Sequence, residues 1–132
     1  MIKVISTMAL NGIDGIPVVV ESSCIGSPSP RLDIIGLPDA AVKEAAGRVR
    51  AAARSSGLPL HNGVLPVTLA PAQVRMEGSS FDLPILLSLI NTDASERIDY
   101  NGKCVAGELS LTGEVRHING ALPMAISARD LG

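Results

Sequence analysis

The chain has 132 residues, of which 46% are hydrophobic and 18% are charged, and its formal net charge is −2. This length suits one folded domain, and this composition excludes a chain that stays disordered through high charge or low hydrophobicity. With a single Phe and a single Tyr, the sequence also excludes an array of aromatic side chains that stack on single-stranded nucleic acid. The longest apolar run, residues 83–90, is far shorter than the roughly 20 residues that cross a bilayer, so we expect no contact with a membrane.

The two cysteines, Cys24 and Cys104, lie far apart without the short spacing of a metal or redox motif. Neither a Cys/His metal pattern nor a secretory signal accompanies them. We therefore expect two buried, reduced thiols in a cytoplasmic protein.

The first part of the chain favours strands. Residues 2–10 and 16–25 are rich in β-branched side chains, and the Asn-Gly and Asp-Gly dipeptides between them are typical of tight turns. This pattern predicts an amino-terminal hairpin. Residues 26–30 contain two prolines and predict a loop, after which residues 32–36 predict a short strand.

Residues 39–56 carry the clearest helix pattern. Asp39 is placed to cap the amino end, and Gly57 is placed to end the helix in the left-handed conformation. At 3.6 residues per turn the small apolar residues share one side, which predicts close packing against a sheet. These residues are Ala41, Val42, Ala45, Ala46, Val49, Ala52 and Ala53.

The middle of the chain predicts a strand, a loop and a second helix. Residues 64–70 are β-rich, and residues 71–80 read as a loop. Asp82 is a plausible amino-terminal cap for a helix whose residues 83–90 are apolar nearly all round, so we expect this helix to be buried.

The last third alternates polar segments with short strands. The polar residues 91–101 predict a mobile connection into a strand at residues 103–108, and residues 114–118 predict a further strand. Asn119 is placed to cap a closing helix that runs through Ala128.

Five segments carry a resemblance to a known family. They are Ile35-Gly-Leu-Pro-Asp39 with Val42-Lys-Glu44, Leu69-Ala-Pro71, Glu77-Gly-Ser-Ser-Phe-Asp-Leu-Pro84, Gly107-Glu-Leu-Ser-Leu-Thr-Gly-Glu114 and Asn119-Gly-Ala-Leu-Pro123. In this order the segments resemble the amino-terminal domain of the ComM/YifB family of magnesium-chelatase-like AAA+ proteins.

The resemblance implies a mixed α/β (α+β) two-layer sandwich with about three helices, as in the second domain of ribosomal small-subunit protein 5 and in the Lon protease domain. It implies that residues 1–132 are a single domain excised from a longer protein and followed there by an AAA+ module. Family members assemble as homo-oligomeric rings, and ComM-like proteins move branched DNA during natural transformation. A GxxxxGK[ST] phosphate loop is absent from the sequence, so we assign ATP and magnesium to the AAA+ module and no cofactor or metal to this domain.

The similarity to Lon raises the alternative of a residual serine peptidase. By that resemblance Ser80 takes the position of the nucleophile, and Leu122 stands where the catalytic lysine is needed. Leucine accepts no proton, and a serine hydroxyl without an adjacent base is a poor nucleophile. We therefore expect no enzyme activity in this domain and interpret His61 and His117 as solvated side chains.

Two surfaces are candidates for contacts. Lys43, Arg50 and Arg54 recur at helical spacing and either meet DNA phosphates or form an ordinary solvated helix face.

The second surface is the loop that carries Arg75, Glu77 and Gly78. It either contacts the AAA+ module or a neighbouring protomer, or it only forms a turn that Gly78 permits. Of the three classes that remain, we favour an interaction domain within an AAA+ ring over a weak DNA-contacting domain and a residual hydrolase.

Overall fold

The computed structural model describes most of the chain. The described residues are 3–26, 31–36, 39–58, 60, 63–71, 76–93 and 99–132, without the side chains of residues 3 and 91–93. Arg75, His61, most of the predicted loop at 26–30 and part of the predicted connection at 91–101 lie outside this description.

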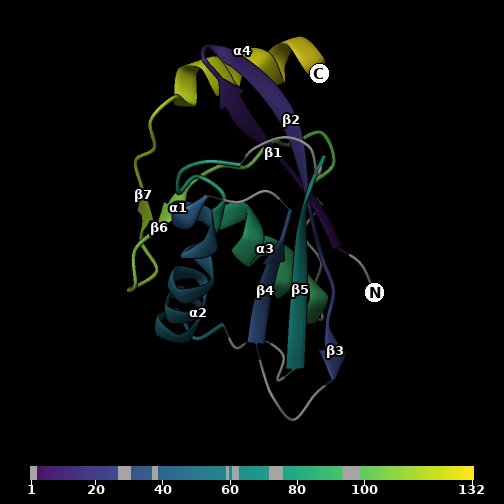
Figure 1. The fold of residues 1–132 in the computed structure, drawn as a ribbon, viewed down its shortest axis with the longest axis vertical. Helices are drawn as coiled ribbons and strands as arrows, with labels where there is room; N and C mark the ends of the chain where they lie inside the picture. The colour runs from purple at the N-terminus through teal and green to yellow at the C-terminus, as the bar shows by residue number, and fades with distance from the viewer. Residues whose placement is uncertain are drawn as a thin grey trace.

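A mixed five-stranded sheet forms the centre of the fold (Figure 1). Its strands are β1 (Lys3–Asn11), β2 (Asp14–Ser22), β3 (Ile25–Gly26), β4 (Arg31–Ile35) and β5 (Gly63–Ala70). The β1–β2 hairpin is antiparallel throughout, as the sequence predicted, and it turns at Gly12 with φ of 65°. β5 pairs antiparallel with β2 and β3 and parallel with β4.

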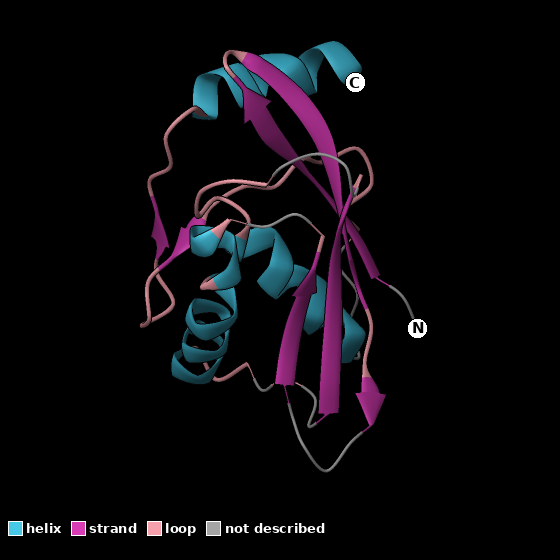
Figure 2. Cartoon of the chain, in the orientation of Figure 1, coloured by secondary structure: helices cyan, strands magenta, loops and turns pink. Residues whose placement is uncertain are grey.

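Helices pack beside this sheet, and a two-stranded ribbon lies at one flank (Figure 2). The helices are α1 (Ala40–Lys43), α2 (Ala45–Ser55), α3 (Asp82–Asp93) and α4 (Ala121–Leu131), and the ribbon pairs β6 (Glu108–Leu109) with β7 (Val115–Arg116). The mixed α/β class predicted from the sequence is confirmed. No helix in the described ranges combines the length and the apolar character that a bilayer crossing requires.

The predicted helix at 39–56 is present but breaks at Glu44 into α1 and α2. Asp39 caps α1 as predicted, since its Oδ1 accepts a hydrogen bond from the Val42 amide at 2.8 Å. The Ala41 carbonyl accepts a hydrogen bond from Arg48 Nη2 at 2.7 Å, whereas an unbroken helix would pair that carbonyl with the Ala45 amide.

The core fills the space between the sheet and the helices α2 and α3. The sheet contributes alternate residues, as in β5, where Leu65, Val67 and Leu69 are buried. On α2, the residues Ala45, Val49, Ala52 and Ala53 share one buried face, which packs against α3 as well as against β4 of the sheet. α3 is buried along most of its length. Phe81, the only phenylalanine, is 1% exposed at the start of α3.

Two elements near the carboxyl end differ from the prediction. The strand expected at 103–108 is broken: Cys104 forms an isolated bridge with Ser6, the Gly107 amide donates to the Ser80 carbonyl, and Glu108 begins β6. Asn119 does not cap α4. The cap is Gly120 with φ of 84°, a position where a side chain would collide with Leu10.

The two cysteines are free thiols, and neither is fully buried. Cys24 is half-buried, whereas Cys104 is exposed, so the expectation of two buried thiols was wrong. The short 103–108 segment leaves Cys104 at the edge of the sheet, but partial desolvation by the surrounding protein still raises the pKa of its thiol.

Candidate functional site

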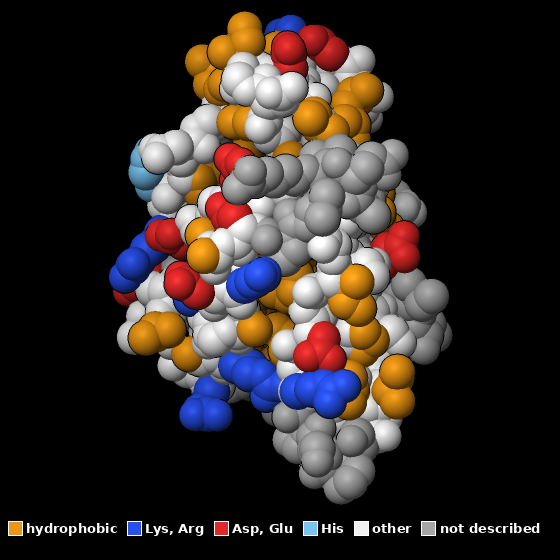
Figure 3. Space-filling model, in the orientation of Figure 1, with side chains coloured by type: hydrophobic (Ala, Val, Ile, Leu, Met, Phe, Trp, Pro, Cys, Tyr) orange, Lys and Arg blue, Asp and Glu red, His pale blue; other side chains and the backbone are white. Residues whose placement is uncertain are grey.

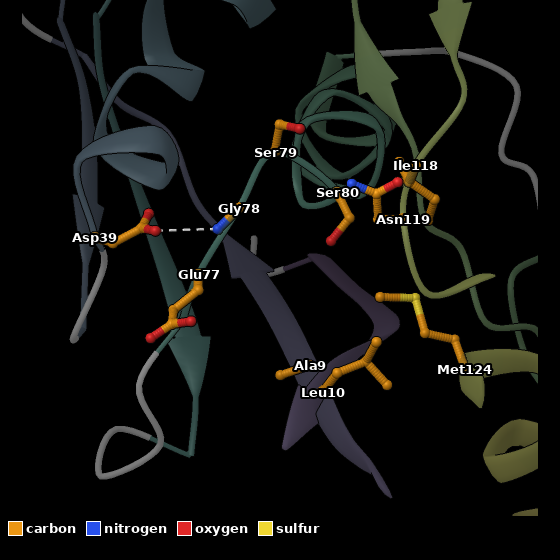
Figure 4. Close-up of a pocket in the computed structure, with 10 residues that line it drawn as sticks. All are labelled: Ala9, Leu10, Asp39, Glu77, Gly78, Ser79, Ser80, Ile118, Asn119 and Met124. Carbon is orange, nitrogen blue, oxygen red and sulfur yellow. Dashed lines mark hydrogen bonds between the residues drawn. The ribbon is translucent and has the colours of Figure 1, made fainter. Parts of the chain in front are cut away.

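A cavity of about 380 Å³ lies between the end of β1, the residues that precede α3 and the start of α4 (Figure 4). Its lining residues are Ala9, Leu10, Asp39, Glu77, Gly78, Ser79, Ser80, Ile118, Asn119 and Met124. Residues from three of the family-like segments therefore meet at one place, although they are far apart in the sequence.

Ser80 supplies the central polar group of this cavity. The residue is 8% exposed, and its hydroxyl points into the space between Gly78, Leu10 and Met124 (Figure 4). Its backbone is fixed, since the Ser80 carbonyl accepts a hydrogen bond from the Gly107 amide at 2.9 Å. The neighbouring Ser79 hydroxyl points away from the cavity.

The Asp39 carboxylate links one wall of the cavity to α1 through two hydrogen bonds. While Oδ1 caps the helix, Oδ2 accepts a hydrogen bond from the Gly78 amide at 3.1 Å. The Asp39 amide in turn donates to the Met76 carbonyl at 2.9 Å. Gly78 has φ of 83°, a conformation that glycine adopts without the steric cost that other residues incur. One carboxylate therefore orders both the helix and the turn.

The cavity presents hydrogen-bonding groups but, among the described residues, no amine or imidazole. Leu122 is 71% exposed on α4 and does not line the cavity, and His117 is exposed and lines a separate hollow. Both oxygens of Asp39 bind backbone amides, and the Glu77 carboxylate turns away from Ser80 (Figure 4). The described lining residues therefore place no amine or imidazole beside the Ser80 hydroxyl.

A buried ion pair behind the cavity was missed by the sequence analysis. Arg48 Nε lies 2.6 Å from Asp82 Oδ2, and the Asp82 side chain has 0% exposure. The Leu109 amide also donates to Asp82 Oδ2, at 3.1 Å. The predicted role of Asp82 as a cap was therefore wrong, because its carboxylate accepts hydrogen bonds from Arg48 and Leu109, which are distant in the sequence. Hydrogen bonding to Asp82 raises the pKa of Arg48, which stays charged.

The predicted basic stripe lies on α1 and α2. Lys43 and Arg54 are exposed and Arg50 is half-buried. Figure 3 shows Lys and Arg side chains gathered over α2 and the adjacent end of β4. Of the predicted loop contacts, Glu77 and Gly78 are exposed at the cavity. The functional roles of both surfaces stay predictions.

The chain is a mixed α/β domain with a cavity that Ser80 lines at the amino end of the buried helix α3. A family model described as subunit ChlI of Mg-chelatase matches residues 20–132. The chain is 37% identical over 130 residues to YifB of Escherichia coli K12, covering 96% of this chain and 25% of that protein. It is also 34% identical over 117 residues to competence protein ComM of Haemophilus influenzae, covering 86% and 22%.

The chain therefore belongs to the magnesium-chelatase-like ChlI family, together with YifB and ComM, as its sequence motifs indicated. It spans about a quarter of the length of these relatives.

Proposed function

We propose that this chain is a non-catalytic interaction domain of a magnesium-chelatase-like AAA+ ATPase. The observation that carries the proposal is the cavity at Ser80. Its described walls hold a buried hydroxyl, backbone groups and two acidic residues, Asp39 and Glu77, without an amine or imidazole to take the serine proton. Such a cavity binds a partner without transforming it.

The wider proposal concerns the parent protein. The matched relatives are about four times as long as this chain, which leaves room for an AAA+ module that binds ATP and magnesium. We place the parent in the cytoplasm as a homo-oligomeric ring that processes DNA, in keeping with the name of competence protein ComM. We also assign residues 1–132 to one domain with the fold of the second domain of ribosomal small-subunit protein 5.

An association experiment tests the interaction role. The 132-residue chain is labelled and titrated with E. coli YifB from which the matching quarter has been deleted. The proposal predicts saturable association that Glu77→Arg weakens, because this residue lies at the cavity. Glu114→Arg makes the same charge change at an exposed position that does not line the cavity, and it leaves association unchanged. No association, or an equal loss in both variants, would contradict the proposal.

A weak DNA contact is the second candidate, and the exposed basic side chains on α1 and α2 favour it. Contacts from Lys43, Arg50 and Arg54 to three phosphates would release about three counterions. Affinity for labelled branched DNA would then fall about 40-fold between about 50 mM and 200 mM salt. The double variant Arg50→Ala, Arg54→Ala would flatten this dependence, and no binding at the lower salt concentration would eliminate the candidate.

A further inference from the structure

The helix α4 is attached to the rest of the domain by few contacts. Met124 is its one buried residue, whereas α2, which has the same length, buries four. α4 lies across the β1–β2 hairpin at one end of the molecule, apart from α2 (Figure 1). Among the described residues, α4 has a single hydrogen bond to this hairpin, from the Gly15 amide to Ser127 Oγ at 2.9 Å. Because a short helix gains most of its stability from its packed face, α4 is held weakly.

The boundary between α4 and its neighbours is also incompletely filled. The cavity described above has Met124 of α4 in its wall. A second hollow of about 230 Å³ is lined by Leu131 and Cys104, among others, and a third of about 430 Å³ by Ala125 and His117, among others. Empty space forgoes the close contacts that hold packed elements together. Opening this boundary therefore costs less than opening the core between the sheet and α3.

We infer that α4 is a movable wall of the cavity, which separates from the β1–β2 hairpin as a unit while the sheet, α2 and α3 stay folded. Elements with few buried apolar contacts open locally in this way. Separation withdraws Met124 from Leu10, and these two side chains lie on the apolar side of the cavity (Figure 4). The position of α4 thus controls access to the Ser80 hydroxyl, whatever ligand the cavity takes.

Amide hydrogen exchange of the wild-type chain tests the motion. After correction for intrinsic rates, we expect the hydrogen-bonded amides of α4 to exchange at least about 100-fold faster than those of α3 and β5. The rate for α4 should change little in dilute urea, because a local opening exposes little surface. Exchange of α4 and α3 at one common rate would show that the two helices open together and would overturn the inference.

Methionine oxidation reports on the side chains that α4 covers. The Met8 sulfur lies beside the contact between Gly15 and Ser127. Met8 is 3% exposed and Met124 is 8% exposed, whereas Met76 is 0% exposed in the core and provides the internal control. Dilute hydrogen peroxide should oxidise Met8 and Met124 at least about tenfold faster than Met76, as mass spectrometry of the peptides measures. Equal protection of all three would contradict the separation of α4.

The substitution Gly15→Ala should favour the separated state. A Cβ at Gly15 would lie 2.5 Å from both Cβ and Oγ of Ser127, and the Gly15 backbone has no positive φ that would add strain. We expect the variant to speed exchange of the α4 amides by about a further tenfold and to leave α3 and β5 unchanged. Gly26→Ala is the matched control, because Gly26 also lies in a strand but has open space around it. Acceleration along the whole chain, or none in α4, would overturn the inference.

Discussion

Arg48 and Asp82 form a two-pronged ion pair, with Nε–Oδ2 at 2.6 Å and Nη2–Oδ1 at 3.0 Å. The pair joins α2 to the first residue of α3, two residues after Ser80. Arg48 Nη2 also binds the Ala41 carbonyl, and Asp82 accepts the Leu109 amide. One buried interaction therefore connects α1, α2, α3 and β6 and fixes the chain that positions the Ser80 hydroxyl.

Removing one member of this pair should be costly. Arg48→Met leaves the fully buried Asp82 carboxylate without its cation, and we expect the free energy of unfolding to fall by about 3–5 kcal/mol in urea denaturation. Glu44→Ala removes only the exposed partner of Arg48 at 3.8 Å and should change the free energy of unfolding by less than about 1 kcal/mol. Similar losses in the two variants would show that the buried pair is not structural.

Gly78 should resist substitution for a conformational reason. Its φ of 83° disfavours a side chain although the space around it is open, so Gly78→Ala should lower the free energy of unfolding by about 1–2 kcal/mol. Gly47→Ala is the matched control. It also has open space, lies in α2 without a positive φ, and should raise stability by up to about 1 kcal/mol. Thermal denaturation of both variants measures the difference, and a stabilised Gly78→Ala would refute the assignment.

Substitution of Asp39 should weaken both α1 and the turn at Gly78, because its carboxylate orders both. Asp39→Ala removes the cap of α1 and the acceptor of the Gly78 amide, so we expect a loss of about 1–2 kcal/mol in urea denaturation. Amide hydrogen exchange should accelerate at both Val42 and Gly78. Acceleration at Val42 alone would mean that the hydrogen bond to Gly78 does not hold the cavity wall.

Cys104 provides a test by pH. Burial raises the pKa of its thiol above 9.0, so the thiolate should form at higher pH in the folded chain than in the unfolded chain. The associated stability is present below pH 9.0 and is lost as pH rises through the folded pKa, because the unfolded thiol ionises first. In a Cys24→Ser variant, the pH profile of iodoacetamide alkylation should shift to lower pH when urea unfolds the chain. An unchanged profile would contradict the assigned cause.

Local signals in the sequence predicted local structure well. Asp39 caps α1 because an N-cap depends on residues within one turn, and Gly57 follows α2 with φ of 68°, as its position indicated. The same reasoning failed for Asp82 and Asn119. Asp82 instead pairs with Arg48, which is 34 residues away in the sequence. Gly120 caps α4 because a side chain at this position would collide with Leu10.

The candidate site was only partly visible in the sequence. Family-like motifs pointed to Ser80, Glu77 and Gly78, which do line one cavity. Nothing local indicated that Leu10 or Met124 would join them, because pairing of strands and docking of α4 bring these residues together. Two features of the sequence would have suggested the Arg48–Asp82 pair. One is an apolar helix that starts with Asp, and the other is an Arg beside the apolar face of another helix.

We propose that the Ser80 hydroxyl is not an activated nucleophile. A fluorophosphonate probe, which labels activated serines, tests this proposal when the 132-residue chain is compared with Ser80→Ala and with an active serine protease. We predict that the protease is labelled and that the wild-type chain gives no more signal than Ser80→Ala. Labelling of the wild-type chain that Ser80→Ala abolishes would show that Ser80 is an activated nucleophile and would contradict the proposed non-catalytic role.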